Sequence, residues 1–179
     1  MEFGIVVAIL IVVLIWWWIS TSNSFKRKKI KISEGLSSVE VALTKRYDVL
    51  TKLLDVTKKY AEHEKDLFSQ VVELRRGMSF EELNRAAAAT DALSTRLFAV
   101  AEAYPELRSA DVFRELQSGI RDAEEHLQAA RRLYNSNVTV FNSAIVVFPA
   151  SIIAKAEHLE EREFFVAEDH KREDVAMKF

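Results

Sequence analysis

The feature that most constrains the fold is an uncharged apolar run near the N-terminus, "FGIVVAILIVVLIWWWI", from Phe3 to Ile19. Its seventeen residues reach the short end of the length that an α-helix needs to cross a bilayer. Three tryptophans close the run and a basic stretch follows it, as is typical of the cytoplasmic flank of a span. The pattern predicts a transmembrane anchor over residues 1–25, with the N-terminus outside and the body in the cytoplasm.

A cleaved signal peptide is the alternative interpretation of this run. A signal peptide begins with a positively charged region, whereas only Met1 and Glu2 precede the apolar residues here. A small-residue cleavage pattern is also missing, since the run continues into Trp16–Trp18 and then "SNSFKRKKIK". The sequence therefore favours a retained anchor in a cytoplasmic membrane.

A basic collar over residues 26–32 follows the anchor. A nucleic-acid-binding tail is one interpretation of such a cluster. Taking its five cations from 25 basic residues and Glu2 from 27 acidic ones leaves 20 and 26, so the remaining chain carries about −6 and repels a phosphate backbone. We therefore expect anionic lipid headgroups, and no nucleic acid, as partners of Lys26, Arg27, Lys28, Lys29 and Lys31.

The remainder of the chain has the periodicity of helices. Mostly apolar residues recur at alternating spacings of three and four from Leu36 to Met78, which predicts a helix over about 33–76. Ser79 and Glu82 have the spacing of a capping box, and Pro149 suits the start of a last helix. The predicted helices cover about 33–76, 80–103 and 110–148, with a fourth starting at Pro149.

The predicted fold is therefore all-α. It consists of an N-terminal single transmembrane helix and an elongated antiparallel up-and-down bundle of about four helices. The bundle is expected over residues 33–166, followed by a loose C-terminal tail over 167–179. Because the apolar stripes of the bundle all begin beyond Lys31, a protein starting at that residue is expected to fold without the anchor.

The motifs of common catalytic and metal sites are missing from the sequence. The chain has no cysteine, which excludes disulfides and thiolate ligands. His63-Glu64 lacks the second histidine of H-E-x-x-H, and none of the four histidines follows a glutamate at the E-x-x-H spacing of di-iron bundles. We expect no enzyme activity, cofactor or metal; a hydrolase is the weakest of three functional hypotheses.

Two charged residues stand in the apolar seam of the first bundle helix, namely Arg46 and Glu64. One interpretation is that their charged ends reach solvent at the edge of the seam. The other is a buried polar network that fixes the register of the helices. The candidate members of that network are Arg46, Glu64, Glu102, Gln117, Glu124 and Arg131.

The expected helix lengths also bear on assembly. At 1.5 Å per residue, the helices over 33–76 and 80–103 would span roughly 66 and 36 Å, so the second could not return to the membrane. The stripe at the start of the first helix would then lie bare, which predicts a homo-oligomer. An earlier start of the second helix, or a bend in the first, is the alternative. The candidate self-association residues are Leu36, Val39, Leu43, Tyr47 and Leu50.

Three segments together resemble the LemA family: "RYDVLTKLLDVTKKYAEHE", "LSTRLFAVAEAYPELRSA" and "FRELQSGIRDAEEHLQAARRLYNSNVTVFNSAIVVFPASIIA". The resemblance covers about residues 32–168 and implies a bacterial protein with one N-terminal span and a cytoplasmic helical bundle. It carries over no activity and no cofactor, and it suggests membrane-associated protein partners. Besides the network candidates, the matching family positions are Tyr47, Asp48, Tyr60, His63, Tyr104, Pro105, Tyr134, Asn135, Asn142, Phe148 and Pro149.

Three positions depart from the family pattern. Thr51 stands in place of a proline, Phe141 in place of a tyrosine, and His158-Leu159 where Gly-Phe is common. A kink at Thr51 is therefore in question, and the chain after the last helix is expected to differ.

The leading functional hypothesis is a membrane-anchored scaffold or adaptor that works through protein contacts. The alternative is a small-molecule or peptide sensor with a polar pocket at the end of the bundle. In that pocket the side chains of Tyr104, Tyr134, Asn135 and Asn142 would converge.

Overall fold

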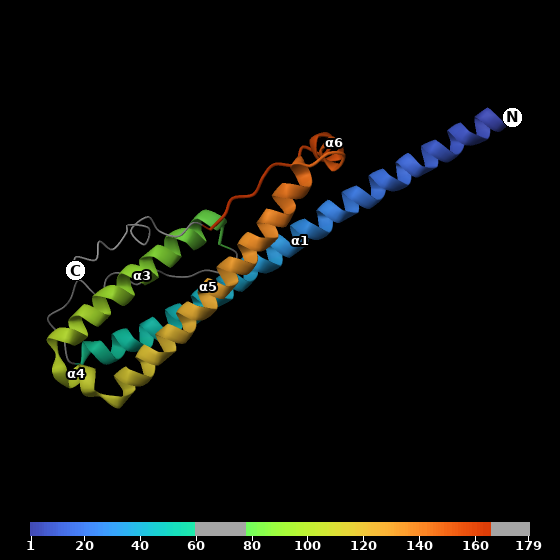
Figure 1. The fold of residues 1–179 in the computed structure, drawn as a ribbon. Coiled ribbons are helices and arrows are strands. Elements are labelled where there is room, and N and C mark those ends of the chain that lie inside the picture. Colours follow the sequence, from blue (N-terminus) through green and yellow to red (C-terminus); the bar gives the residue numbers. More distant parts are fainter. Residues whose placement is uncertain (60–77, 166–179) are drawn as a thin grey trace, which may run out of the picture. The chain divides into compact units, whose positions relative to one another are not determined.

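The computed structural model describes residues 1–59 and 78–165, and the regular elements in these residues are all helices. The predicted all-α class, with one long apolar N-terminal helix followed by further helices, is confirmed (Figure 1). The helices are α1 (Glu2–Lys58), α3 (Phe80–Ala103), α4 (Pro105–Ser109), α5 (Asp111–Val146) and α6 (Ala150–Ala156).

The chain divides into two compact units. The first unit combines Met1–Ile32 with the chain from Tyr134 onward, and the second consists of Ser33–Leu133. Both α1 and α5 contribute to each unit, because each helix passes a unit boundary within its length.

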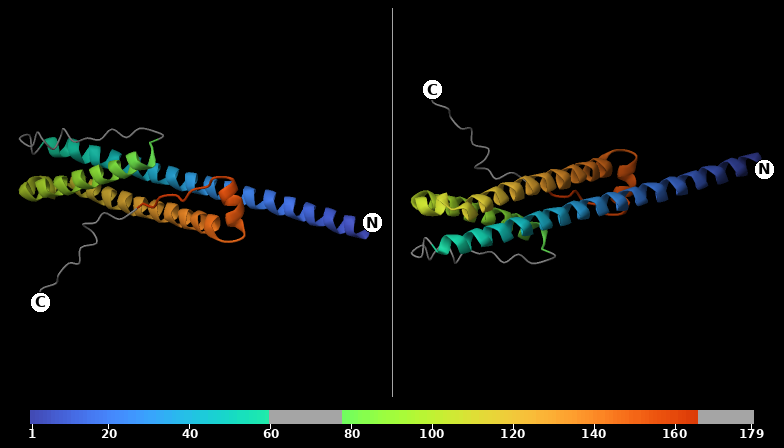
Figure 2. Two further views of the ribbon diagram at one scale, coloured as in Figure 1. Left: turned by 90° about the horizontal axis from the view of Figure 1, so that it is seen from above. Right: turned by 90° about the horizontal axis from the view of Figure 1, so that it is seen from below.

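An apolar cluster from four helices holds the second unit together. Leucines 50, 53 and 54 of α1 pack with Leu93, Leu97 and Ala101 of α3, Leu107 of α4, and Phe113 and Ile120 of α5. In this unit α3 runs in the same direction as the neighbouring part of α1, and α5 runs in the opposite direction (Figures 1 and 2). The sequence predicted an antiparallel α3, because it extended the first bundle helix to Arg76; the described α1 ends at Lys58, and residues 60–77 lie outside the described part of the chain.

The stripe expected to lie bare at the start of the bundle is covered. Val39, Leu43 and Leu50 are fully buried within the chain, and Leu36 and Tyr47 are half-buried. The expectation of an uncovered surface is wrong because α3 lies alongside the described end of α1 instead of beginning beyond it. Self-association through these five residues thereby loses its physical motivation.

The local signals at helix ends and breaks behave as their chemistry requires. The capping box of α3 is confirmed: Ser79 N donates to Glu82 Oε2 at 2.7 Å, and Glu82 N donates to Ser79 Oγ at 3.2 Å. The short helix α4, with Pro105 at its start, was not predicted. α1 continues through Thr51, whose Oγ1 donates to Tyr47 O at 2.9 Å, so the helix does not end there.

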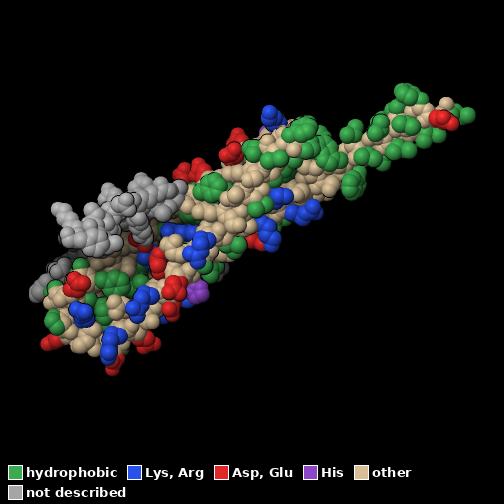
Figure 3. Space-filling view, in the orientation of Figure 1, with side chains coloured by type: hydrophobic (Ala, Val, Ile, Leu, Met, Phe, Trp, Pro, Cys, Tyr) green, Lys and Arg blue, Asp and Glu red, His purple; other side chains and the backbone are tan. Residues whose placement is uncertain are grey.

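The first unit contains the apolar run and the residues that follow it. The most apolar stretch of α1 is not buried inside the protein, and α1 is long and apolar enough to cross a membrane. Hydrophobic side chains cover that end of the helix on the face seen in Figure 3. Beyond the run, however, Ser22 is 8% and Phe25 is 2% exposed. The apolar core therefore includes Phe25, which lies before Lys31, contrary to the expectation that the apolar stripes all begin beyond that residue.

After α6 the chain turns back through a left-handed residue. His158 has a φ of 51°, His158 N donates to Lys155 O, and Leu159 N donates to Ala154 O. These bonds form a Schellman motif, a helix ending that favours glycine at the left-handed position. The departure from the family pattern at His158-Leu159 therefore lies at the one residue here that requires a positive φ. The chain then continues as the terminal segment, residues 157–165.

Candidate functional site

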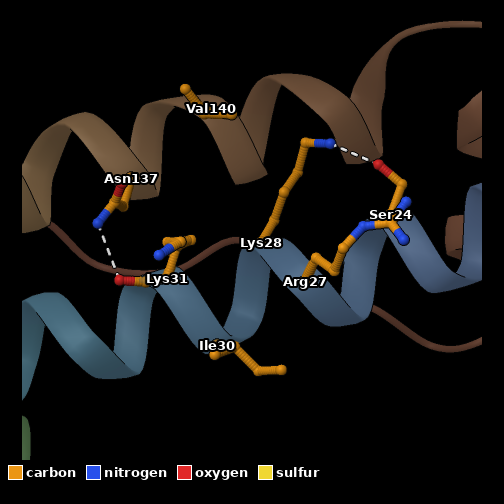
Figure 4. A pocket seen from close by; sticks show the side chains of 7 residues that line it. All are labelled: Ser24, Arg27, Lys28, Ile30, Lys31, Asn137 and Val140. Carbon is orange, nitrogen blue, oxygen red and sulfur yellow. Dashed lines mark hydrogen bonds between the residues drawn. The ribbon is translucent and has the colours of Figure 1, made fainter.

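The basic collar lies on α1 in the first unit, beside the last part of α5. A groove of about 280 Å³ lies along the two helices there, and Ile30 and Val140 are the apolar residues among those that line it (Figure 4). Asn137 Nδ2 donates to Lys31 O at 2.8 Å and fixes the register of the two helices. The other lining residues are Ser24, Arg27, Lys28 and Lys31.

The cations of the collar face outward to different degrees. Lys26, Arg27 and Lys31 are exposed, whereas Lys28 and Lys29 are half-buried. Lys28 Nζ donates to Ser24 Oγ at 2.7 Å, as Figure 4 shows. Ammonium and guanidinium groups beside an apolar groove form a surface that suits a phosphate headgroup with its attached acyl chain.

A second polar arrangement, the ion cluster, lies in the second unit. It consists of Arg46 on α1, Thr90 and Asp91 on α3, and Glu124 on α5. Arg46 is 4% exposed and its Nη1 pairs with Asp91 Oδ1 and, at 3.0 Å, with Glu124 Oε2. The same atom donates to Thr90 Oγ1 at 3.5 Å. One buried guanidinium therefore ties three helices together.

The predicted polar network is present in part. Arg46 is buried and pairs with Glu124, as the buried-network interpretation requires, and it does not reach solvent at the edge of the seam. Glu102 is exposed, whereas Gln117 and Arg131 are half-buried on α5. Glu64 lies outside the described residues, together with the family positions Tyr60 and His63.

Sequence reasoning missed Thr90 and Asp91. Thr90 is a polar residue within the predicted helix over 80–103, and Asp91 is its neighbour along the chain. The available signal was a polar residue within the helix followed directly by a carboxylate. Nothing in the sequence, however, distinguished Asp91 from the other acidic residues of α3. The parallel run of α1 and α3 brings Asp91 beside Arg46.

A third arrangement, the amide ladder, joins α5 to the terminal segment in the first unit. Asn142 Nδ2 donates to Arg162 O, and Arg162 N donates to Asn142 Oδ1, both at 2.9 Å. Asn135 makes the same pair of bonds with Phe165, at 2.8 and 2.9 Å. Each amide group thus bonds to both the N–H and the C=O of one residue in the terminal segment, which has no regular secondary structure.

Tyr134 completes the amide ladder. Its hydroxyl donates to Glu163 O at 3.1 Å, and its ring meets Phe165 edge to face at 5.0 Å between centroids. Burial raises the pKa of the Tyr134 phenol, Arg162 lowers it less, and Glu163 adds to the rise. The neutral phenol is therefore the form that the folded state favours.

Of the four residues named for a sensor pocket, three bind the terminal segment of the first unit and the fourth belongs to the second unit. Tyr104 packs against the apolar cluster of the second unit. In the first unit, both amide groups of Asn135 and Asn142 and the Tyr134 hydroxyl are bonded to the terminal segment. These side chains have a structural role in the fold.

The remaining family positions lie at surfaces and corners. Asp48 is exposed, and Pro105 begins α4. Phe148 is 76% exposed and stands with Pro149 between α5 and α6. This exposure is unusual for a large aromatic side chain.

Comparison with known proteins places these features in a family context. The LemA family matches residues 35–179. Protein LemA of Metamycoplasma hominis is 25% identical over 162 residues, which is 88% of this chain and 74% of that protein. Magnetosome protein MamQ of Magnetospirillum gryphiswaldense is 29% identical over 70 residues, which is 39% of this chain and 26% of that protein.

Proposed function

The chain belongs to the LemA family, and from this premise we propose that it is a non-enzymatic scaffold, anchored in the bacterial cytoplasmic membrane by α1. The N-terminus lies outside and the body lies in the cytoplasm. The body holds membrane-associated proteins through its helical surface. The observation that carries the proposal is the continuity of α1 from the apolar run through the collar to Lys58.

That continuity supports an anchor that is retained. Ser22 and Phe25 follow the run closely and are buried in the first unit, so the residues next to the span belong to the folded body. Cleavage at the end of the run would cut within a continuous helix. The outward-facing cations of the collar support the cytoplasmic side for the body, because Lys and Arg accumulate on that flank of a span.

A surface of the second unit supports protein contacts. An apolar recess of about 590 Å³ lies between α1 and α5. Val41, which is 70% exposed, and Leu133, which is 53% exposed, both line it. Large apolar side chains grouped at a recess are typical of protein-binding surfaces. Self-association is proposed for this recess rather than for the stripe, with a different membrane-associated protein as the other possible occupant.

Site-specific photocrosslinking in native membranes tests the scaffold. A photoreactive amino acid replaces Val41 or Leu133 in the full-length chain, and the matched control carries it at Arg121, an exposed position on α5 in the same unit. We expect adducts from both recess positions and none from Arg121. Adduct mass then separates a second copy from another protein.

The same experiment can contradict the proposal. The proposal would be contradicted if neither Val41 nor Leu133 gave an adduct in cells that express the chain at its native level. That result would count against a scaffold that works through this surface. The sensor hypothesis stays the alternative, although Tyr134, Asn135 and Asn142 already bind the terminal segment.

A further inference from the structure

The corner between α5 and α6 exposes large apolar side chains. Val146 is 58%, Val147 59% and Phe148 76% exposed, and Ile152 on α6 is 51% exposed. We call these four residues the α5–α6 corner. Exposed apolar side chains are ordinary when single, whereas four within seven positions of the chain mark a contact surface.

The corner ends a stretch of α5 and α6 that carries no charge. Between Arg132 and Lys155 the sequence has no Asp, Glu, Lys, Arg or His. Together α5 and α6 are long and apolar enough to cross a membrane, but they are bent by 94° at the break between them. A bend of this size at an apolar tip is the shape of an element that touches a bilayer without crossing it.

The register of α5 on α1 places the corner at the height where the span ends. Asn137 lies level with Lys31, since its side chain bonds to that backbone oxygen. The helices run in opposite directions in this unit, as Figures 1 and 2 show. Nine residues further along α5, Val146 is therefore level with Ser22, about 4–5 Å along the helix axis from the last residue of the apolar run.

We propose that the α5–α6 corner is a second membrane-contact element, which inserts its four apolar side chains into the same leaflet that the anchor leaves. The proposal rests on the membrane anchoring proposed above. Lipid is the occupant because the corner lies level with the end of the exposed apolar surface of α1 and is followed by the exposed Lys155. The bend directs α6 across α5, which is the orientation of an interfacial helix.

The charges around the corner fit this depth. Lys155 is exposed on α6, three residues after Ile152 and thus on the same side of the helix. Its ammonium group can reach the headgroups while the apolar corner lies below them. The collar cations on α1 begin at Lys26, further from the span than the level of Val146. The apolar and basic layers of both helices therefore match those of one leaflet.

Depth-dependent fluorescence quenching tests the inference directly. The chain has no cysteine, so single cysteines introduced by V147C or I152C take one NBD fluorophore each. The full-length protein is reconstituted in vesicles of phosphatidylethanolamine and phosphatidylglycerol that carry a nitroxide on the headgroup, near the top of the acyl chain or near its end. We expect the nitroxide near the top of the chain to remove most of the fluorescence at both positions.

Two further positions make the result interpretable. V12C lies in the apolar run, where the side chain is 65% exposed, and must be quenched by the deepest nitroxide. F164C lies in the terminal segment of the same unit, where the side chain is 42% exposed, and must escape both acyl-chain nitroxides. Phe164 is a matched control because Phe165 beside it bonds to Asn135, on the far side of Asn137 from the corner.

Each outcome decides one point. Quenching at Val12 with no more quenching at Val147 and Ile152 than at Phe164 overturns the inference and leaves the anchor intact. No quenching at Val12 removes the anchor, and the inference falls with it. Blue-shifted emission at Val147 and Ile152 that no lipid nitroxide quenches shows a protein covering the corner, which also overturns the assignment to lipid.

Discussion

The ion cluster of the second unit and the amide ladder of the first unit solve the same problem with different chemistry. Each has buried polar groups that must be satisfied away from water. In the ion cluster, one guanidinium meets two carboxylates from other helices. In the amide ladder, neutral side chains of α5 take up backbone groups of the terminal segment. The first arrangement ties helices to one another, and the second ties a segment without regular structure to a helix.

The difference between the two arrangements follows the cost of burying charge. A buried charge is costly to desolvate and depends on its partners, whereas a bonded amide is far less costly to bury. The amide ladder lies within the uncharged stretch of α5 that ends at the α5–α6 corner. The unit that contains the apolar run thus joins its parts with uncharged groups, and the ion cluster belongs to the other unit.

Removing the residues that follow the apolar run should lower the stability of the first unit more than any other change. A protein that starts at Ser20 keeps the buried Phe25, whereas one that starts at Lys31 lacks it. Loss of a buried phenylalanine costs roughly 3–5 kcal/mol, so the shorter protein should be less stable by at least that amount. Chemical denaturation of both in mild detergent measures the difference. Equal midpoints would show that the first unit does not need the helix before Lys31.

The ion cluster should respond strongly to loss of its cation. Arg46→Ala leaves Asp91 and Glu124 facing each other without a counter-charge, which costs roughly 3–5 kcal/mol. The control is Lys58→Ala, whose partner Asp55 and own side chain are both largely exposed. That change should cost less than about 1 kcal/mol. Similar thermal midpoints for the two variants would reject a structural role for the cluster.

Much of this could be predicted from the sequence, for identifiable reasons. The spacing of three and four placed Arg46 in the seam of α1, and Glu124 was one of the candidate partners named for it. The capping box marked the start of α3 because its chemistry is local. Asp91 was not predicted, since its contact depends on the direction of α3, which no local pattern encodes.

The amide ladder marks a different limit of sequence reasoning. Tyr134, Asn135 and Asn142 were selected through a family resemblance, and seven residues separate the two amides, so they share a face of α5. Their partners are backbone groups of residues 162–165. Backbone groups are the same in every residue, and the terminal segment has no periodic pattern. Nothing in the sequence therefore linked the two.

Removing one amide of the amide ladder should lower the free energy of unfolding by less than removing Arg46 from the ion cluster. Asn142→Ala leaves the N–H and C=O of Arg162 without their partner, which costs about 1–2 kcal/mol because both groups are only part-buried. Asn137→Ala is the matched control on the same helix, since it removes one exposed hydrogen bond. In urea denaturation, Asn142→Ala should be clearly less stable than Asn137→Ala. The reverse order would show that the terminal segment contributes little to stability.

Alkaline pH should lower the free energy of unfolding by a smaller amount, through Tyr134 in the first unit. Because the pKa of Tyr134 is raised in the folded state, the native protein holds this proton more tightly than the unfolded chain does. The resulting stability is fully present below the unfolded pKa of about 10 and is lost as pH rises through the folded value. The difference in unfolding free energy between wild type and Tyr134→Phe should therefore be constant below about pH 10 and shrink above it. A difference that stays constant into strong alkali would contradict the shift.

The smallest effect concerns the turn that leads from α6 into the terminal segment, and here the expected sign is stabilising. His158 adopts a φ of 51°, a conformation that costs a side chain with a Cβ roughly 1–2 kcal/mol and glycine almost nothing. His158→Gly removes that strain but also gives the unfolded chain more freedom, which returns about 0.5–1 kcal/mol. The net gain should be about 0.5–1 kcal/mol, since the Schellman bonds from His158 N and Leu159 N do not involve the side chain. His158→Ala is the control, because it keeps the Cβ and should leave the midpoint almost unchanged. If His158→Ala stabilises the protein as much as His158→Gly, the source of strain is the imidazole side chain and not the positive φ of the backbone.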